Sequence, residues 1–418
     1  DHRDLHSFPT RRSSDLSTLR RVSAFTPDAV REQTGNWQEL RLAAAERFAT
    51  APLPTPDEEI WRYSRIDQLD LDRFAPAPCV TEVVVPDGFE SLIAIDVEPE
   101  LFPDETPDVF AELNRAFMSP TVVRVPAGRA VAEPIMITHR IGGSGTAVFP
   151  RLVIDAGADS EITVVERFVA ADGTDADTAL VVPVLQVHAQ QAARVRYLAV
   201  NEVGIATWQI GNQQAVGGRD SDTLLATVTL GGDYVRARTE ARLSGQGGST
   251  KQVALYFAGG TQMHDFRTIQ DHDAPNTSSD LLFKGAVQDH AASVYTGLIK
   301  IREHANGTAA YQTNRNLTLS EGAWAESVPN LDIRTNDVKC SHASTVGPID
   351  EEQRFYLESR GVRPEVAERL VVLGFFEEVI AQLPAGRFAE DLRTRVSNKL
   401  DVGSESTRSA GDRQEVPA

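Results

Sequence analysis

Short stretches rich in β-branched residues recur from Thr121 to Gly347, and no helix-length pattern interrupts them. Apolar and polar side chains alternate in many of them, as in strands that bury one face. Glycine pairs such as Gly231-Gly232 separate neighbouring stretches. The strand-like stretches are residues 122–125, 135–138, 152–154, 162–165, 180–182, 195–200, 224–230, 253–257, 281–283, 293–301 and 317–319. Many short strands without helices predict a sandwich, a barrel or a solenoid.

A recurring sequence pattern in this region favours the solenoid. A glycine turn is followed by small residues and then by an alternating strand at residues 127–137, 156–164 and 321–331. Approximate repetition over so long a region exceeds most sandwiches. A β-helix also stacks like residues of successive coils into ladders, which suits the polar row formed by Gln312, Asn314 and Asn316. We therefore predict a mainly β fold with a right-handed β-helix core at residues 121–347, flanked by helical domains.

The region before the strands is expected to be helical in part. Residues 1–16 are polar and aperiodic, and we interpret them as a disordered lead-in or a scar of cloning or sequence assembly. Residues 17–120 are interpreted as an N-terminal helical region with a connector. Within them an apolar stripe predicts a helix at residues 36–50, the acids of residues 57–59 suit the start of a second, and residues 108–117 are compatible with a third.

Helices return at residues 348–396, which we predict to be a C-terminal helical domain. Asp350 and Gln353 form a capping-box arrangement, and Gly361 is the expected stop of that helix. Pro364 suits the first turn of a second helix. This helix carries more apolar side chains than packing against one neighbour would bury, which predicts that a partner docks on it. The candidate docking residues are Phe355, Tyr356, Leu370, Leu373, Phe375 and Phe376. A third helix is expected at residues 388–396, and residues 397–418 form a polar tail that we predict to be disordered.

The charge balance and the cysteine count exclude several classes of protein. A formal net charge of −19 argues against nucleic acid or an anionic membrane surface as the main partner, because both require a basic footprint. No apolar run approaches the roughly 20 residues of a membrane span, and no signal peptide is apparent. The two cysteines, Cys79 and Cys340, are far apart in sequence and form no disulfide framework. We expect a soluble, cytoplasmic protein.

Cys340 and His342 carry the most concentrated chemistry in the sequence. The alternation of Val338, Cys340, His342 and Ser344 places them on one face of one strand, with the Cys and the His about 7 Å apart. Thiolate and imidazole are potential ligands of a soft or borderline metal. The alternative is a cysteine packed as a small hydrophobe beside a histidine bonded to the backbone. Two ligands do not complete a metal site, so others would have to come from elsewhere, such as another chain.

Two further groups of residues are weaker candidates. The histidines His264, His272, His290 and His304 would form a metal site only on neighbouring coils, and otherwise lie in turns or on the surface. Asp332 and Arg334 could resemble the acid–base set of a β-helix polysaccharide lyase, against the alternative of a solvated ion pair. Sequence motifs for phosphate loops, dinucleotide binding and nucleophile elbows are absent. The sequence therefore contains no complete catalytic set.

Several motifs stand together in the second half of the chain. They are residues 276–279 (Asn-Thr-Ser-Ser), Lys284-Gly285, residues 294–301, residues 311–317, residues 337–342 (Asp-Val-Lys-Cys-Ser-His) and residues 350–361. They resemble the SufB/SufD family of iron–sulfur cluster assembly proteins. Residues 54–63, with Trp61-Arg62-Tyr63, resemble the N-terminal region of the SufD branch. The absence of a cysteine between Cys79 and Cys340 also favours that branch, because SufB members carry a sulfur-accepting cysteine in the β-helix.

The resemblance implies a β-helix between two helical domains and a non-enzymatic role in cluster assembly. It implies pairing with a SufB-like subunit through the ends of the β-helices, and binding of a SufC-like ATPase by the C-terminal helices. A transient iron–sulfur cluster would assemble at the SufB interface, with His342 as a candidate ligand and Cys340 beside it. The bacterial cytoplasm or the plastid stroma would be the location. The alternative is a β-helix carbohydrate-active enzyme, which needs clustered carboxylates that the sequence does not show.

Overall fold

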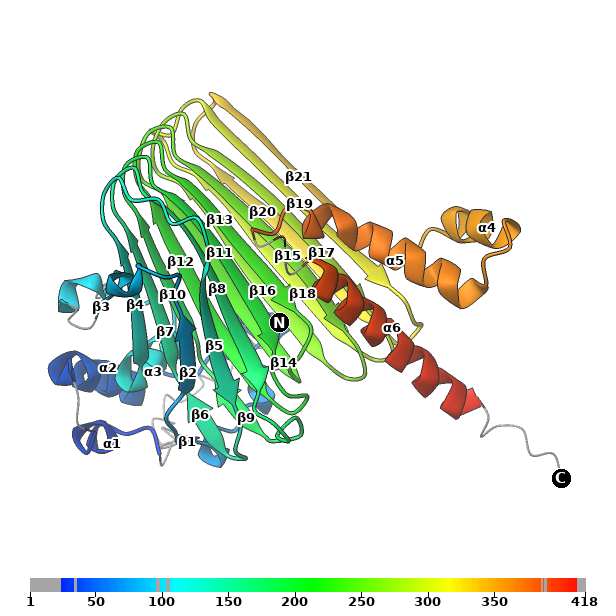
Figure 1. Cartoon of the computed structure of the whole chain (residues 1–418), viewed down its shortest axis with the longest axis horizontal. Helices are drawn as coiled ribbons and strands as arrows, with labels where there is room; N and C mark the ends of the chain where they lie inside the picture. The colour runs from blue at the N-terminus through cyan, green and yellow to red at the C-terminus, as the bar shows by residue number, and fades with distance from the viewer. Residues whose placement is uncertain are drawn as a thin grey trace, which may run out of the picture.

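The computed structural model describes residues 24–33, 36–94, 98–102, 106–384, 386 and 389–411. The fold is mainly β, with helices toward both ends of the chain (Figure 1). From β4 onward each coil places a strand in one sheet and then a strand in the other, so that the chain winds as a solenoid. The predicted mainly β solenoid is thereby confirmed, while its right hand and the division into domains stay predictions. The expected lead-in, residues 1–16, lies outside the described residues.

The two sheets have separate sets of strands. Sheet A contains β3 (Ile93–Ala94), β4 (Ser119–Val125), β7 (Pro150–Ala156), β10 (Val184–Ala189), β12 (Trp208–Gly217), β14 (Tyr234–Leu243), β16 (Met263–His272), β18 (Ala292–Ile301) and β20 (Trp324–Ile333), with β1 (Ala75–Pro76), β6 (Thr146–Val148) and β9 (Ala179–Val181) to one side. Sheet B contains β2 (Val80–Val84), β5 (Ile135–Ile141), β8 (Glu161–Ala170), β11 (Arg194–Glu202), β13 (Asp222–Thr229), β15 (Ser249–Ala258), β17 (Ser278–Val287), β19 (Thr308–Thr318) and β21 (Val338–Gly347).

Eight coils can be followed through the described residues, each with one strand in each sheet. They are β4–β5, β7–β8, β10–β11, β12–β13, β14–β15, β16–β17, β18–β19 and β20–β21. Neighbouring coils pair in parallel, whereas β2 and β3 pair antiparallel with the first coil. Like positions therefore stack along the solenoid, and side chains that point inward form rows through successive coils.

One inward row of sheet B runs the whole length of the solenoid. Its members, in register from coil to coil, are Ile135, Val164, Tyr197, Leu225, Gln252, Leu281, Gln312 and His342. Every member except the last is buried. The row changes from apolar in the early coils to partly polar in the later ones, and it ends in a histidine at the last strand.

The structure differs from the sequence predictions at three places. The acids of residues 57–59 do not open an α-helix, because Trp61 packs under Arg236 and the segment forms only the 3-10 turn η1 (Glu59–Trp61). Strands β14 and β16 were not predicted, since their many charges obscure the alternation. Helix α6 (Ala389–Gly411) extends past residue 396, the predicted end of the third C-terminal helix, while the tail expected from residue 397 stays a prediction.

The charges in β14 and β16 are satisfied inside the molecule. Arg236 donates to Asp265 at 2.5 Å, and Arg267 donates to the same carboxylate at 2.7 Å. Burial alone would raise the pKa of Asp265, but the two guanidinium groups outweigh it and lower that pKa. Arg236 also donates to the carbonyl of Ile60. The N-terminal segment therefore covers sheet A and is tied to it by buried arginines.

The helices form two groups, one from the N-terminal and one from the C-terminal region of the chain. Helices α1 (Pro27–Arg31), α2 (Gln38–Thr50) and α3 (Val109–Phe117) form an N-terminal cluster, and the predicted helices at residues 36–50 and 108–117 are confirmed. Helix α5 (Pro364–Ile380) packs on β15 and β17, while α4 (Glu351–Ser359) buries none of its residues and stands away from the sheets (Figure 1). Among the described residues, no helix combines the length and the apolar character that a membrane span requires.

Candidate partner interface at the open end

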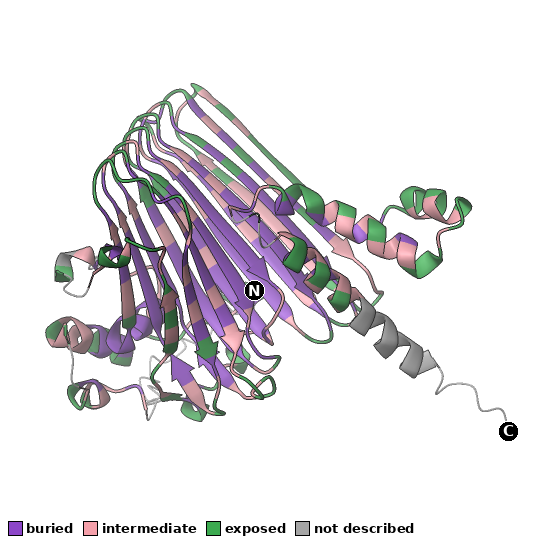
Figure 2. Cartoon of the chain, in the orientation of Figure 1, coloured by how far each residue is buried: buried purple, intermediate pink, exposed green. Residues whose placement is uncertain are grey.

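The last coil leaves one end of the solenoid uncovered. Strands β20 and β21 each pair with a neighbour on one side only, and within the described part of the chain nothing pairs with their outer edges. Figure 2 shows the contrast, with exposed and intermediate residues along the last strands and buried residues in the coils behind them. Unpaired strand edges are sites at which another chain can add, and proteins otherwise protect them.

Inward positions of β21 continue the core rows of β19. Cys340 follows Ala310 in register, His342 follows Gln312, and Ser344 follows Asn314. The β19 side chains are at most 2% exposed, whereas His342 and Ser344 are exposed. Cys340 and His342 thus share a face, as the alternation predicts, and that face is the solenoid interior at the point where it becomes open to solvent.

The two sheets meet across this open end. The Ser344 hydroxyl of β21 donates to the Ser327 hydroxyl of β20 at 2.7 Å. Leu331 and Ile333 occupy the inward positions of β20, in register with the buried Ile299 and Ile301, but are 42% and 39% exposed. A further coil or a partner chain would cover them. Ser344 belongs to the alternating row that the sequence analysis identified, whereas Ser327 was not identified, although alternation within β20 was the available signal.

Cys340 and His342 differ in their surroundings. Cys340 packs partly against the cluster of Ile299, Ile301 and Ala310, and this burial raises the pKa of its thiol. His342 is exposed above Gln312, whose side-chain amide has no hydrogen-bond partner among the described residues. Nowhere among the described residues is a group of three or more His, Cys, Asp or Glu residues arranged to hold a metal. Any metal bound here would therefore need ligands from another molecule.

The histidines of the weaker metal hypothesis do not form a site. His264 is buried and contacts the carbonyl oxygen of Gly231 at 3.2 Å, and burial lowers its pKa to about 3. His272 lies 2.8 Å from each of two hydroxyl groups, those of Thr277 and Ser279, and burial lowers its pKa to about 4. Both imidazoles are thus neutral and engaged in local hydrogen bonds.

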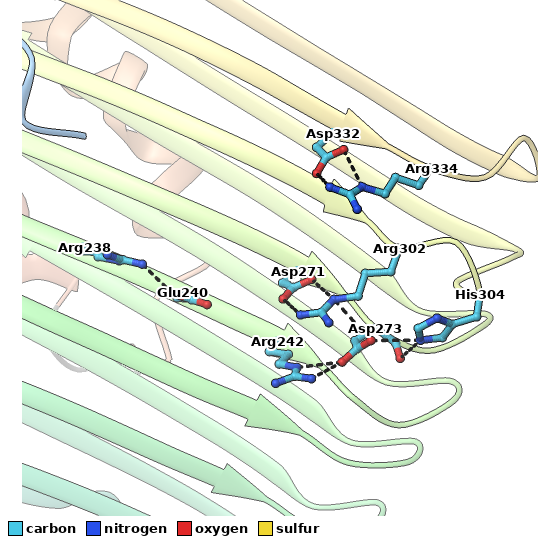
Figure 3. Close-up of polar contacts among 9 residues, drawn as sticks. All are labelled: Arg238, Glu240, Arg242, Asp271, Asp273, Arg302, His304, Asp332 and Arg334. Carbon is cyan, nitrogen blue, oxygen red and sulfur yellow. Dashed lines mark hydrogen bonds and ion pairs between the residues drawn. The ribbon is translucent and has the colours of Figure 1, made fainter. Parts of the chain in front are cut away.

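Asp332 and Arg334 form an exposed ion pair with two bonds of 3.1 Å, drawn in Figure 3. The bond from Arg334 lowers the pKa of Asp332, so the carboxyl group stays ionised and cannot serve as a general acid. Figure 3 shows similar pairs on neighbouring coils, where Arg302 bonds Asp271 and Arg242 bonds Asp273. The arrangement is a ladder of ion pairs, and it gives no support to a polysaccharide lyase.

The predicted docking residues divide into two groups. Phe355, Tyr356 and Leu370 are 70%, 59% and 46% exposed, whereas Leu373 and Phe375 are half-buried. Phe376 is fully buried, with its ring 6.3 Å from that of Phe257. It holds α5 on the chain's own sheet, and including it in a free docking surface is therefore wrong.

A groove between α4 and α5 contains three members of this set, the exposed Tyr356 and Leu370 and the half-buried Phe375. Its volume is about 1020 Å³, and it is lined by Leu317, Asp350, Glu352, Gln353, Tyr356, Leu357, Leu370, Val371, Gly374 and Phe375. The Asp350 carboxylate accepts from the backbone of Glu352 and Gln353, as the predicted N-cap of α4. The groove is thus formed by an ordered helix pair and not by a loop.

Comparison with known proteins assigns the chain to a family. The family model described as SUF system FeS cluster assembly, SufBD core domain, matches residues 139–375, which is more than half of the chain. The chain belongs to the SufBD family. The matched residues of this SufBD-family chain run from β5 to within α5, so they include both the open end of the solenoid and most of the α4–α5 groove.

Named relatives agree with the assignment to the SufBD family. An iron–sulfur cluster assembly SufBD family protein of Mycobacterium tuberculosis is 34% identical over 369 residues, covering 85% of this chain and 91% of the relative. The iron–sulfur cluster assembly protein SufD of Escherichia coli is 26% identical over 388 residues, covering 84% and 90%. The SufD protein of Bacillus subtilis is 32% identical over 281 residues, covering 66% and 63%.

Proposed function

We propose that this SufBD-family chain is a SufD-type subunit of the iron–sulfur cluster assembly machinery. It pairs with a SufB-like subunit through the open end of its solenoid and binds a SufC-like ATPase at the α4–α5 groove. The observation that carries the proposal is the uncapped last coil. There an inward row that is buried for seven coils ends in the exposed His342, beside the half-buried Cys340.

The open end has the properties of a protein–protein interface. Free edges on β20 and β21 offer backbone donors and acceptors to strands of another solenoid. Leu331, Ile333 and Val346 are 39–44% exposed and supply apolar surface that a partner would bury. A SufB-like solenoid that ends in a similar coil would continue both sheets and cover these side chains.

A nascent iron–sulfur cluster is the substrate that we assign to this interface. The imidazole of His342 and the thiol of Cys340 are iron ligands by type and project from one strand face. Burial raises the pKa of Cys340, so its thiol must lose a proton when it binds iron. The remaining ligands would come from the SufB-like partner, because none is arranged nearby within the described residues.

The α4–α5 groove is the site that we assign to the SufC-like ATPase. Tyr356 and Leu370 expose apolar surface along it, as expected of a docking helix pair. Helix α5 is also fixed to sheet B, where the Lys284 ammonium donates to the Phe375 carbonyl at 2.8 Å and pairs with Glu378 at 2.6 Å. A displacement of the ATPase would therefore be passed through α5 to the solenoid and its open end.

Anaerobic co-expression with SufB-like and SufC-like partners, followed by size exclusion and iron and sulfide analysis, tests the proposal. We expect a complex that contains one chain of this protein, one SufB-like chain and two SufC-like chains. His342→Ala should lower the iron content while the complex persists. The matched control is His304→Ala, because His304 is also exposed but bonds Asp273 away from the inward row. Equal iron in both variants would refute the ligand assignment.

Two further substitutions separate the surfaces. Leu331→Asp should prevent pairing with the SufB-like chain, and its control is Val80→Asp, an exposed valine on β2 at the opposite edge of sheet B. Leu370→Asp should release only the SufC-like chain bound by this subunit, and its control is Ile205→Asp, which is 68% exposed between β11 and β12. A chain that elutes alone beside its partners would overturn the subunit proposal.

A further inference from the structure

A second cluster of reactive groups lies at the opposite edge of sheet B from His342. Cys79 immediately precedes β2, which pairs with β5, and β5 pairs with β8 and β8 with β11 (Figure 1). Inward positions on three of these strands hold Thr81, His139 and Glu166 in close contact. The other inward positions of β5 and β8, such as Ile137 and Val164, are apolar, so a buried imidazole and carboxylate between them require an explanation.

The contacts form a relay from sulfur to carboxylate. The Cys79 sulfur lies 3.6 Å from Nδ1 of His139, and Nε2 of the same ring lies 2.9 Å from an oxygen of Glu166. The other Glu166 oxygen accepts a hydrogen bond of 2.5 Å from the Tyr197 hydroxyl. A thiol, an imidazole and an orienting carboxylate in this sequence are the parts of an activated cysteine nucleophile.

Thr81 indicates where the proton lies. Its hydroxyl oxygen is 2.9 Å from Nδ1 of His139 and 3.7 Å from the Cys79 sulfur. If Nδ1 carries a proton, the ring donates to Thr81 and to Cys79, and the hydroxyl is free to donate to a sulfur anion. If Nδ1 carries none, the thiol and the hydroxyl compete for one lone pair. The protonated ring therefore satisfies more of these groups.

The electrostatics around the ring agree with this arrangement. Burial alone would lower the pKa of His139, but its contacts with Cys79 and Glu166 outweigh burial and raise that pKa to about 9. The His139 ring stacks on Phe168 with centroids 5.0 Å apart, which fixes its orientation. Other charges on these strands are paired with one another on the outer surface, Arg140 with Glu82 at 3.8 Å and Arg167 with Glu202 at 3.1 Å.

The far end of the relay borders a small polar cavity. The cavity measures about 10 Å³ and is lined by Glu166, Phe168, Pro183, Leu185, Tyr197, Asn201, Gln209, Gly211, Asn212 and Gln213. The side-chain oxygens of Gln209 and Asn212 are buried there without a hydrogen-bond partner among the described residues. A space of this size suits about one water molecule, which would satisfy these oxygens beside the carboxylate.

We propose that Cys79 is a nucleophilic thiolate that reacts with the sulfur of small disulfides, and that His139 and Glu166 are its positioning residues. The Cys79 thiolate attacks one sulfur of R–S–S–R, so that a Cys79–S bond forms and R–S⁻ leaves. The proton stays on His139, and no net oxidant is needed beyond the disulfide itself. Cys79 is partly exposed, so a small disulfide reaches it, and a later thiol reverses the step.

Cys340 provides an internal reference, since it is the chain's only other cysteine. The experiment compares the full-length Cys340→Ala protein, which retains Cys79, with Cys79→Ala, which retains Cys340. Each reacts with an aromatic disulfide, and release of the aromatic thiolate gives the rate. An ordinary thiol gains about 50-fold in rate between about pH 6.5 and about pH 8.5, because its pKa is near 8.5.

We expect the rate at Cys79 to change less than about fivefold over that pH range, and to exceed the rate at Cys340 at least about tenfold at the acidic end. Glu166→Gln, which removes the negative charge and keeps only one of the two acceptor oxygens, should reduce this advantage, and His139→Gln should abolish it. If His139→Gln does not fold, ultraviolet titration of the thiolate in the Cys340→Ala protein makes the same test. An ordinary pH profile, or a thiolate that does not react, would overturn the proposal. Either result leaves the subunit proposal unaffected.

Discussion

Helix α5 depends on Phe376 for its attachment to the solenoid, and Phe376→Ala tests this directly. The ring is 0% exposed and lies in a core cluster that joins α5 and α6 to sheet B, with Phe257 as one neighbour. Removing a fully buried phenylalanine ring costs about 3–5 kcal/mol, from lost burial and from the cavity that remains. Because the ring lies between helix and sheet, we expect the cost to fall on their attachment and not on the coils.

Hydrogen exchange measured by mass spectrometry can detect this difference. A loss of about 3–5 kcal/mol corresponds to exchange accelerated by about 10²–10³-fold or more for amides protected by the docking of α5. Amides of β4 and β7, which contribute no residue to that cluster, should exchange as in the unmodified protein. The control is Phe355→Ala on α4, which is 70% exposed and should change stability by less than about 0.5 kcal/mol. Equal acceleration in both variants, or acceleration spread over all coils, would refute the reasoning.

Three other perturbations have expected outcomes. The pKa of His139 is raised in the folded chain from 6.5 to about 9, so its contribution to stability is complete below pH 6.5 and is lost as pH rises through 9. The free energy of unfolding, measured by denaturant titration, should therefore fall by up to about 3 kcal/mol over that range, and His139→Gln should remove this pH dependence. Gly285→Ala should fold poorly, because its new Cβ would lie 1.9 Å from the ring of Tyr256, whereas Gly374→Ala in α5 meets no atom within 4 Å and should be neutral or stabilising in thermal melts. Arg334→Gln should leave the melting temperature unchanged, since its aspartate partner is exposed to water; a clear drop would show that the ladder of ion pairs stabilises the coils.

Local patterns in the sequence determined the class of fold and the elements at its C-terminal end. Alternation predicts a strand wherever one face is polar, and most of the predicted strands lie where expected. Helix α4 begins after Asp350 and ends before Gly361, which has a φ of +86°, as the cap and stop signals predict. These signals act over a few residues, so the sequence alone contains them. The same holds for the pairing of Cys340 with His342 on one face.

Burial of polar residues could not be read from the sequence. Strand β14 carries Arg236, Arg238, Glu240 and Arg242 at alternate positions, which local rules assign to a solvent face. Arg236 is nevertheless 2% exposed, because Asp265 of the next coil and the N-terminal segment supply its partners. Helix α5 is apolar on several sides, so only packing decided that Phe376 faces the sheet while Leu370 faces solvent.

The sequence contributes more to the prediction of the His342 site than to that of the Cys79–His139 site. His342 follows from the motif at residues 337–342, but only the register of β21 on β19 shows that it ends an inward row at an open coil. Cys79 and His139 are separated by 60 residues and come together only because β2 pairs antiparallel with β5. Alternation is a property of neighbours in sequence, whereas the meeting of two side chains depends on coil register, which is set by contacts between distant parts of the chain.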